Sequence, residues 1–342
     1  MKALIKTARG PGNIEMREIP VPQFSDNEVL IQIKAVGLCG SDVHIEQDDI
    51  PYEVPVVLGH EFCGIIVEKG RDVTSLEPGD RVVVENVAGG CGKCEMCLTG
   101  HHQICAVRKS QGIHINGGFA EYVACRASNV YKIPDSISFE EAALMEPVTV
   151  CTHAVLEQTP VKPGDVVLIT GPGSIGIIAA MIARASGAEV ILAGTGKDAR
   201  RLKIAESLGI DKVVNIETED LFGVVFGATD GAGADVVLEC SGAAQAVFSN
   251  LCLLKTRGFY NQIGVLGSDV NFNFNILLIK EANIKGSLSH SDYAWKRAIK
   301  MVATQQIDLK PLITHKFKLA EWEKAFKAFR DQEGVKIIFT MD

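Results

Sequence analysis

Short apolar runs alternate with helical patterns through the middle of the chain. Residues 166–170 (VVLIT) and 189–193 (EVILA) have the length and apolar character of buried strands, and residues 174–186 between them form a helical pattern. Further strand candidates, which also alternate with helical patterns, lie at 212–216, 234–240 and 258–264. This alternation predicts a parallel, doubly wound sheet, which is an α/β fold.

The carboxy-terminal part of the chain has a different pattern, which begins after about residue 285. One helical stripe is formed by Trp322, Ala325, Phe326 and Phe329. Residues 335–339 (VKIIF) indicate a buried strand. Because an aromatic stripe at helical spacing is more often core than ligand site, we expect this segment to contribute to a hydrophobic core.

The composition is that of a globular protein. The chain has 342 residues, 47% of them hydrophobic, and this length exceeds the usual size of one hydrophobic core, so we expect two domains. The formal net charge is −8, and no basic run is longer than Arg200-Arg201. A negatively charged chain without a basic cluster would repel the phosphate backbone of a nucleic acid, so we expect no nucleic-acid partner.

The beginning of the chain bears on the compartment. Residues 1–20 are interrupted by charges and lack the apolar core of a signal peptide. The longest apolar helical run, residues 175–185, is broken by Arg184 and is too short to cross a bilayer. We therefore expect a cytoplasmic protein without a membrane partner, in which clustered thiols favour a metal over disulfides.

Four cysteines lie within one glycine-rich stretch, residues 89–105. Their spacing, C-x2-C-x2-C-x7-C, suits a closed structural zinc site held by Cys91, Cys94, Cys97 and Cys105. The alternatives are free buried thiols or an iron–sulfur cluster, whose ligands can also be closely spaced. His101 and His102 could compete as ligands, but four thiolates already close the shell, so we expect both to be solvated loop residues.

A second, mixed set of potential ligands lies upstream. Cys39, His60 and Glu61 offer one sulfur, one nitrogen and one oxygen, which suits a catalytic zinc with an open position better than a closed structural site. A lone cysteine or histidine is usually a core residue, so this hypothesis depends on the residues occurring together.

Glycines follow the first predicted strand in G-x-G-x-x-G spacing, at Gly171, Gly173 and Gly176. Between a strand and a helix, the motif allows a tight turn and lets a pyrophosphate approach the helix N-terminus, where Ser174 and Ile175 lie. The motif therefore predicts a Rossmann dinucleotide site.

The end of the second strand normally carries an acid that binds the ribose 2′-hydroxyl of NAD. Here the sequence reads GTG around Thr195, with Arg200 and Arg201 close behind. These bases could bind a 2′-phosphate, which predicts NADP preference or dual use of NAD and NADP. The alternative is that both arginines are solvated residues of a helix, for which Asp198 is expected to be the N-cap or a first-turn acid rather than a ribose ligand.

The residues around the mixed ligand set resemble those of the zinc-dependent medium-chain dehydrogenase/reductase family. The pattern G-H-E-x2-G-x5-G-x2-V is met in full from Gly59 to Val73, and the resemblance covers essentially the whole chain. It implies a mainly β, GroES-like catalytic zinc domain at 1–150 and 286–342, with the structural zinc lobe at 89–105, and a Rossmann domain at 151–285. It also implies two zinc ions per subunit and a homo-oligomer, a tetramer.

This resemblance implies roles for single residues. Cys39 and His60 resemble the family's catalytic zinc ligands, and Glu61 resembles the third ligand of its sorbitol-dehydrogenase-like members. Glu146 stands where the alcohol dehydrogenase branch has a cysteine, so the fourth contact would be a carboxylate, direct or through water. That substitution points to polyols rather than simple alcohols.

Ser41 and His44 match the family's proton relay, which passes the proton of the substrate hydroxyl to solvent by way of the cofactor ribose. The leading hypothesis is a zinc-dependent oxidoreductase that transfers hydride between a secondary hydroxyl of a polyol, sugar alcohol or polyol phosphate and NAD(P). The alternatives are a threonine-dehydrogenase-like amino-alcohol oxidoreductase and a non-catalytic nicotinamide-binding protein. A mere binding protein would have no use for both an open metal site and a proton relay.

Overall fold

The computed structural model describes residues 1–341, which divide into two compact units. The first unit comprises Met1–Glu146, Ile299–Thr304 and the chain from Asp308 onward, and the second comprises Pro147–Ala298 and Gln305–Ile307. Each unit has its own β-sheet structure and its own hydrophobic core. The domain boundaries predicted from the sequence stay predictions.

The second unit contains a six-stranded sheet in which every pairing is parallel. Its strands, in spatial order, are β11 (Lys212–Asn215), β10 (Glu189–Gly194), β9 (Val166–Thr170), β12 (Ala234–Glu239), β13 (Leu254–Gln262) and β14 (Asn283–Gly286). The order turns around at β9, whose Val167 pairs with Val190 on one side and Val236 on the other. Such a switch point is where open α/β sheets bind ligands, beyond the carboxyl ends of the strands. The predicted doubly wound sheet is confirmed.

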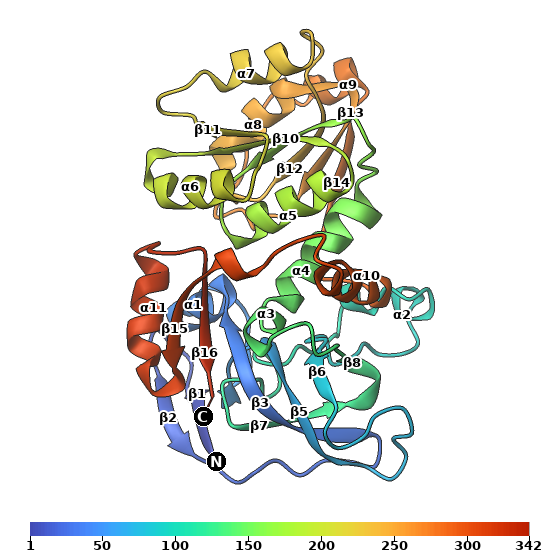
Figure 1. The fold of residues 1–342 in the computed structure, drawn as a ribbon, viewed down its shortest axis with the longest axis vertical. Helices are drawn as coiled ribbons and strands as arrows, with labels where there is room; N and C mark the ends of the chain where they lie inside the picture. The colour runs from blue at the N-terminus through green and yellow to red at the C-terminus, as the bar shows by residue number, and fades with distance from the viewer. Residues whose placement is uncertain (342) are drawn as a thin grey trace. The chain divides into compact units, whose positions relative to one another are not determined.

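Helices cover both faces of this sheet (Figure 1). One face carries α5 (Ser174–Ala185) and α6 (Ala199–Ser207), and the other carries α7 (Leu221–Ala228), α8 (Ala244–Leu253) and α9 (Asn275–Lys280). All five residues of β9 are buried. Burial on both faces explains why the central strands are continuous apolar runs rather than alternating ones.

The first unit is mainly β. Its larger sheet has the order β15 (Ile313–Lys318), β16 (Lys336–Thr340), β3 (Glu28–Leu38), β5 (Glu61–Lys69), β6 (Arg81–Val84) and β8 (Val130–Lys132), and β7 (Tyr122–Arg126) also pairs with β3. A three-stranded sheet joins β2 (Ile14–Glu18), β1 (Lys2–Lys6) and β4 (Val56–Val57). The carboxy-terminal strand β16 pairs antiparallel with β3, with Ile337 opposite Leu38. The chain end thus becomes part of the sheet that carries the candidate site.

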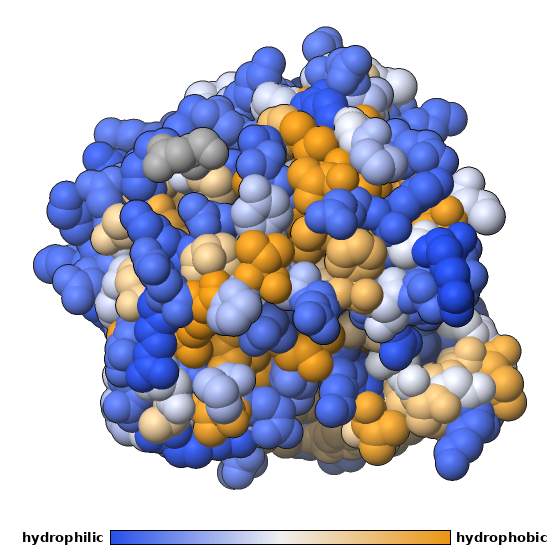
Figure 2. All heavy atoms as spheres, turned by 90° about the horizontal axis from the view of Figure 1, so that it is seen from below, coloured by the Kyte–Doolittle hydropathy of each residue, from blue (hydrophilic) through white to orange (hydrophobic). Residues whose placement is uncertain are grey.

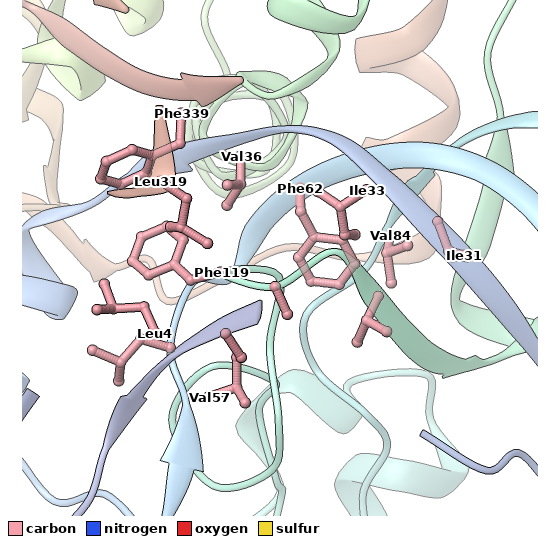
Figure 3. Close-up of a cluster of buried hydrophobic side chains, with 14 of the residues drawn as sticks. Leu4, Ile31, Ile33, Val36, Val57, Phe62, Val84, Phe119, Leu319 and Phe339 are labelled. Atoms are coloured by element: carbon pink, nitrogen blue, oxygen red, sulfur yellow. The ribbon is translucent and has the colours of Figure 1, made fainter. Parts of the chain in front are cut away.

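The core of the first unit gathers side chains from strands that are distant in sequence (Figure 3). The rings of Phe119 and Phe339 meet edge to face with centroids 5.1 Å apart. The predicted carboxy-terminal helix is α11 (Trp322–Arg330), which buries Ala325 and Phe326 in this core, while Trp322 packs against it. The prediction that the aromatic stripe is core is confirmed.

The shorter helices of the first unit are α1 (Gly40–Gln47), α2 (Glu95–Leu98) and α3 (Phe139–Ala142), and α4 (Met145–Thr152) begins there. Viewed from below, hydrophobic residues form a broken band on a mostly hydrophilic surface (Figure 2). Among residues 1–341, every helix is too short or too polar to cross a membrane.

Candidate metal centres and nucleotide site

The mixed ligand set is assembled by the pairing of two strands. Cys39 follows the last residue of β3, His60 directly precedes β5, and Glu61 is the first residue of β5. Because Gly37 of β3 lies opposite Glu61 in the antiparallel register, the three residues come together. One potential ligand atom of each lies within 4.8 Å of those of the other two, and His60 and Glu61 are buried. One thiol, one imidazole and one carboxylate at this separation fit a divalent metal of the zinc type.

Lys336 is a member of this cluster that the sequence interpretation missed. Its side chain is 3% exposed, its ammonium pairs with a Glu61 oxygen, and it donates a hydrogen bond of 3.1 Å to the Leu38 carbonyl. Burial lowers the pKa of Lys336, but the negative charges of Glu61 and Cys39 outweigh burial, so the pKa is raised overall. A lysine inside an apolar strand was the one local signal that could have revealed it.

Gly37 is required by the close approach of these side chains. A β-carbon at this position would overlap the Glu61 carboxylate and lie 3.0 Å from Cε of Lys336. Any residue other than glycine would therefore displace the buried ion pair.

Asp42 orients the other side of the cluster. It is fully buried on α1, accepts hydrogen bonds from the backbone N–H groups of Cys39 (3.0 Å) and Gly59 (3.3 Å), and lies 3.5 Å from Nδ1 of His60. Burial lowers the pKa of His60, but Asp42 and Cys39 raise it well above its usual value. A carboxylate beside a potential histidine ligand typically fixes the ring orientation.

Glu146 lies beside this cluster, in the first turn of α4. Among the described residues it does not join the three-residue group in which all ligand atoms lie within 4.8 Å. Its Oε1 accepts a hydrogen bond of 3.1 Å from Nδ2 of Asn86. Burial raises the pKa of Glu146 to about 7, with His60 opposing and Glu61 adding to the rise.

Ser41 and His44 both lie on α1, directly after Cys39. The Ser41 hydroxyl oxygen is 3.3 Å from the Cys39 sulfur. His44 is exposed and its Nδ1 lies 3.4 Å from a carboxylate oxygen of Asp49. The helix thus places one hydroxyl at the cluster and one imidazole at the surface, and the relay itself stays a prediction.

The four lobe cysteines come together as a separate group. Their sulfurs all lie within 4.8 Å of one another, and all ten cysteines of the chain are free. The backbone N–H of Cys91 donates to the Cys105 sulfur at 3.4 Å, and such bonds lower the pKa of Cys105 to about 6. Backbone hydrogen bonds also lower the pKa of Cys91. A thiolate is the form that binds metal, so four converging sulfurs, two of them with a lowered pKa, fit a zinc ion.

The prediction for His102 was wrong. Its Nε2 is 2.7 Å from Oε1 of the buried Glu85, so His102 is held against the residue that follows β6. His101 is exposed, as expected. The sequence could not show this contact, because Glu85 precedes the lobe whereas His102 lies near its end, 17 residues later.

The glycine motif lies between β9 and α5. Gly171 has a positive φ of 94°, and a β-carbon there would lie 2.6 Å from the Ser241 backbone. A β-carbon on Gly176 would overlap the Gly171 carbonyl, whereas one on Gly173 would meet nothing within 4 Å. Ser174 and Ile175 are the first residues of α5, so their backbone N–H groups belong to the unbonded first turn.

The loop after β10 is held by its own acid. The Thr195 hydroxyl donates to Asp198 at 2.9 Å, Asp198 precedes α6, and Arg201 lies 3.4 Å from Asp198. A β-carbon on Gly196 would lie 2.5 Å from a carboxylate oxygen of Glu217. The loop therefore carries one acid, Asp198, and approaches a second, Glu217, which follows β11, while the predicted bases Arg200 and Arg201 lie in the first turn of α6.

Comparison with known proteins places the chain in a family. Residues 25–135 match the alcohol dehydrogenase GroES-like domain, and residues 174–304 match the zinc-binding dehydrogenase domain. The chain is 39% identical to the sorbitol dehydrogenase of Halalkalibacterium halodurans, over 99% of both chains. It is 37% identical to the D-arabitol-phosphate dehydrogenase of Enterococcus avium, over 99% of this chain and 97% of the relative.

Two further comparisons agree with this placement. The chain is 34% identical to the L-threonine 3-dehydrogenase of Bacillus subtilis, over 99% of this chain and 98% of the relative. A zinc-binding dehydrogenase of Sinorhizobium meliloti, solved with NADP bound, superposes with a TM-score of 0.93 at 32% identity, over 99% of both chains. The chain therefore belongs to the zinc-dependent medium-chain dehydrogenase family and matches its polyol dehydrogenase branch.

Proposed function

We propose that this chain is a zinc-dependent dehydrogenase that transfers hydride between a secondary hydroxyl of a polyol, sugar alcohol or polyol phosphate and NAD(P). The observation that carries the proposal is the mixed thiol, imidazole and carboxylate set within 4.8 Å, in a chain that also has a glycine-rich turn before a helix N-terminus. Similarity to sorbitol and D-arabitol-phosphate dehydrogenases favours polyols over simple alcohols.

Two groups of residues would hold the two metals. Cys39, His60 and Glu61 would hold the catalytic zinc, with Glu146 as a fourth contact, direct or through water. The four lobe cysteines would hold the structural zinc. When bound at an open site, zinc supplies a Lewis acid that polarises the substrate oxygen.

The chain itself supplies the path for the proton. Ser41 would accept the proton of the substrate hydroxyl, and the exposed His44, three residues later on α1, would release it to solvent. Support for this relay is the 3.3 Å approach of the Ser41 hydroxyl to Cys39 and the solvent exposure of the His44 ring. Ser41→Ala is therefore expected to lower kcat more than it changes nucleotide binding.

The nucleotide would place its pyrophosphate at the N-terminus of α5, against Ser174 and Ile175. Arg200 and Arg201 would bind a 2′-phosphate, which gives NADP preference or dual use, while Asp198 and Glu217 act against NADP. Rates with NAD and NADP test this balance. A strong preference for NAD would refute the 2′-phosphate assignment.

We also propose that the protein is a homo-oligomer, a tetramer, in the cytoplasm. β14 pairs with β13 alone among the described strands, so one edge of the parallel sheet is unpaired. Leu278 and Ile279 of the neighbouring α9 are 77% and 76% exposed. An open edge beside apolar side chains favours pairing with a second copy of the chain. Ten free cysteines suit a reducing compartment.

The direct test is a panel of initial rates of nicotinamide reduction. Matched free and phosphorylated polyols, together with threonine, are each tested with NAD and with NADP on zinc-loaded protein. The proposal predicts activity on one member of a polyol pair. Activity confined to threonine would move the chain to the amino-alcohol alternative, which the B. subtilis relative favours. Silence across the panel would favour a non-catalytic nicotinamide-binding protein.

A further inference from the structure

Two carboxylates could contact a metal at the mixed site, and each is held by a different neighbour. Glu61 is paired with the Lys336 ammonium, whereas one oxygen of Glu146 accepts a hydrogen bond of 3.1 Å from the Asn86 side-chain amide. Asn86 and Glu146 are 7% and 9% exposed, so this hydrogen bond is shielded from water. A buried carboxylate depends on such donors, because an unsatisfied one is costly.

The backbone around Asn86 is fixed on both sides. Asn86 follows β6, and its carbonyl accepts a hydrogen bond of 2.8 Å from the Gln111 N–H. The N–H of Glu85 donates to the Asn129 carbonyl at 2.8 Å, and the Asn129 side chain donates to the Val87 carbonyl at 2.5 Å. The Asn86 amide is therefore presented from a rigid segment and restrains the Glu146 oxygen that it contacts.

We propose that Asn86 is a positioning residue that keeps Glu146 from becoming a permanent metal ligand. The inference rests on the proposed function of the mixed site. A catalytic zinc site keeps one position open, and a free carboxylate beside it would close the shell. By holding Oε1 of Glu146, Asn86 keeps that position available to the substrate oxygen, while Glu146 stays close enough to act in the site.

The kinetic test replaces Asn86 by leucine, which is similar in size and donates no hydrogen bond. Released Glu146 would compete with the substrate oxygen, so KM for the polyol is expected to rise about tenfold to a hundredfold, the range for a hydrogen bond to a charged group. The value of kcat should stay within about threefold, because saturating substrate displaces a competitor. The double variant Asn86→Leu/Glu146→Ala should have the KM of Glu146→Ala alone.

A spectroscopic test needs no substrate. Cobalt replaces zinc, and the spectrum of the Cys39→Ser variant is subtracted, so that the cobalt bands of the four-cysteine site cancel. In Asn86→Leu, an added carboxylate ligand is expected to weaken and shift the visible bands, and Glu146→Ala in the same background should restore them. The matched control is Gln111→Leu, which removes a 3% exposed amide that contacts Ala124 and Cys125 instead of Glu146.

The control separates positioning from simple stability. Gln111→Leu should lower the melting temperature and leave KM and the cobalt spectrum unchanged. If Asn86→Leu does not fold, Asn86→Ala also removes the donor and should move both readouts in the same direction. An unchanged KM and an unchanged spectrum in a folded Asn86 variant would overturn the inference. Because cobalt reports without substrate, absence of polyol activity in the unmodified protein would count against the proposed function alone.

Discussion

Lys336→Met is expected to destabilise the metal-free protein far more than the metal-loaded protein. Lys336 is 3% exposed and pairs with the equally buried Glu61 carboxylate. Methionine fills a similar volume but removes the ammonium that pairs with this carboxylate. Removing one partner of a buried ion pair costs about 3–5 kcal/mol, because the other charge stays buried and uncompensated.

A metal bound by Glu61 would supply the missing positive charge, so most of this cost should disappear on metal binding. If the full amount is recovered, the metal affinity of the variant rises by about a hundredfold to a few thousandfold, since 1.4 kcal/mol corresponds to a factor of ten. Loss of the long-range contact between β16 and β3 is a smaller effect, because the strands remain paired through their backbones.

The assay combines denaturant unfolding of the metal-free and zinc-loaded forms with chelator competition. Each form of the variant is compared with the same form of the unmodified protein, so that the contribution of the four-cysteine site cancels. The control is Lys324→Met, which breaks the exposed pair with Glu321 and should change stability by less than about 1 kcal/mol. Equal losses in both forms, or an unchanged metal affinity, would refute the role given to Lys336.

Two other predictions concern the thiols and an ion pair of the second unit. Cys94→Ser should weaken folding or assembly, whereas Cys39→Ser should abolish turnover in a folded protein; unfolding curves and rates check both, and the reverse pattern would contradict the assignment of the two metals. Burial raises the pKa of Glu157, but hydrogen bonds from His153 (2.5 Å) and Ser291 (2.8 Å) outweigh it and hold the pKa below its usual value. This contribution to stability is present above the usual glutamate pKa of about 4.3 and is lost as pH falls through the lower folded value. Between pH 5 and pH 3 the free energy of unfolding should therefore fall more for the unmodified protein than for Glu157→Gln, which denaturant unfolding at each pH measures. An equal fall in both proteins would disprove this.

The fold was predictable wherever the signal is local. The central strands of the parallel sheet are apolar because both faces are covered, and β9 has the bounds that its apolar run predicts. β14 was missed because its four residues are all exposed, and pairing with β13 alone makes it a strand. The carboxy-terminal strand was predicted at 335–339. It begins and ends one residue later in the structure, as β16.

The candidate sites were also predictable only where their residues lie close together in the sequence. The cysteine spacing and the glycine motif are compact in sequence, so each group could be proposed as a unit before the structure was known. The roles of Asn86 and Lys336 could not be predicted, because their partners lie far away in the chain and only the fold brings them together. His102 was misjudged for the same reason, since its partner Glu85 precedes the lobe.

Oxidation of the polyol needs the metal, whereas binding of the nucleotide uses other residues. The decisive experiment measures polyol oxidation and nucleotide binding on one sample, before metal removal, after it and after zinc is restored. Activity should disappear with the metal and return with zinc, while nucleotide affinity stays nearly constant, since the glycine motif contains no metal ligand. Full activity in metal-free protein would show that the metal does not take part in the oxidation.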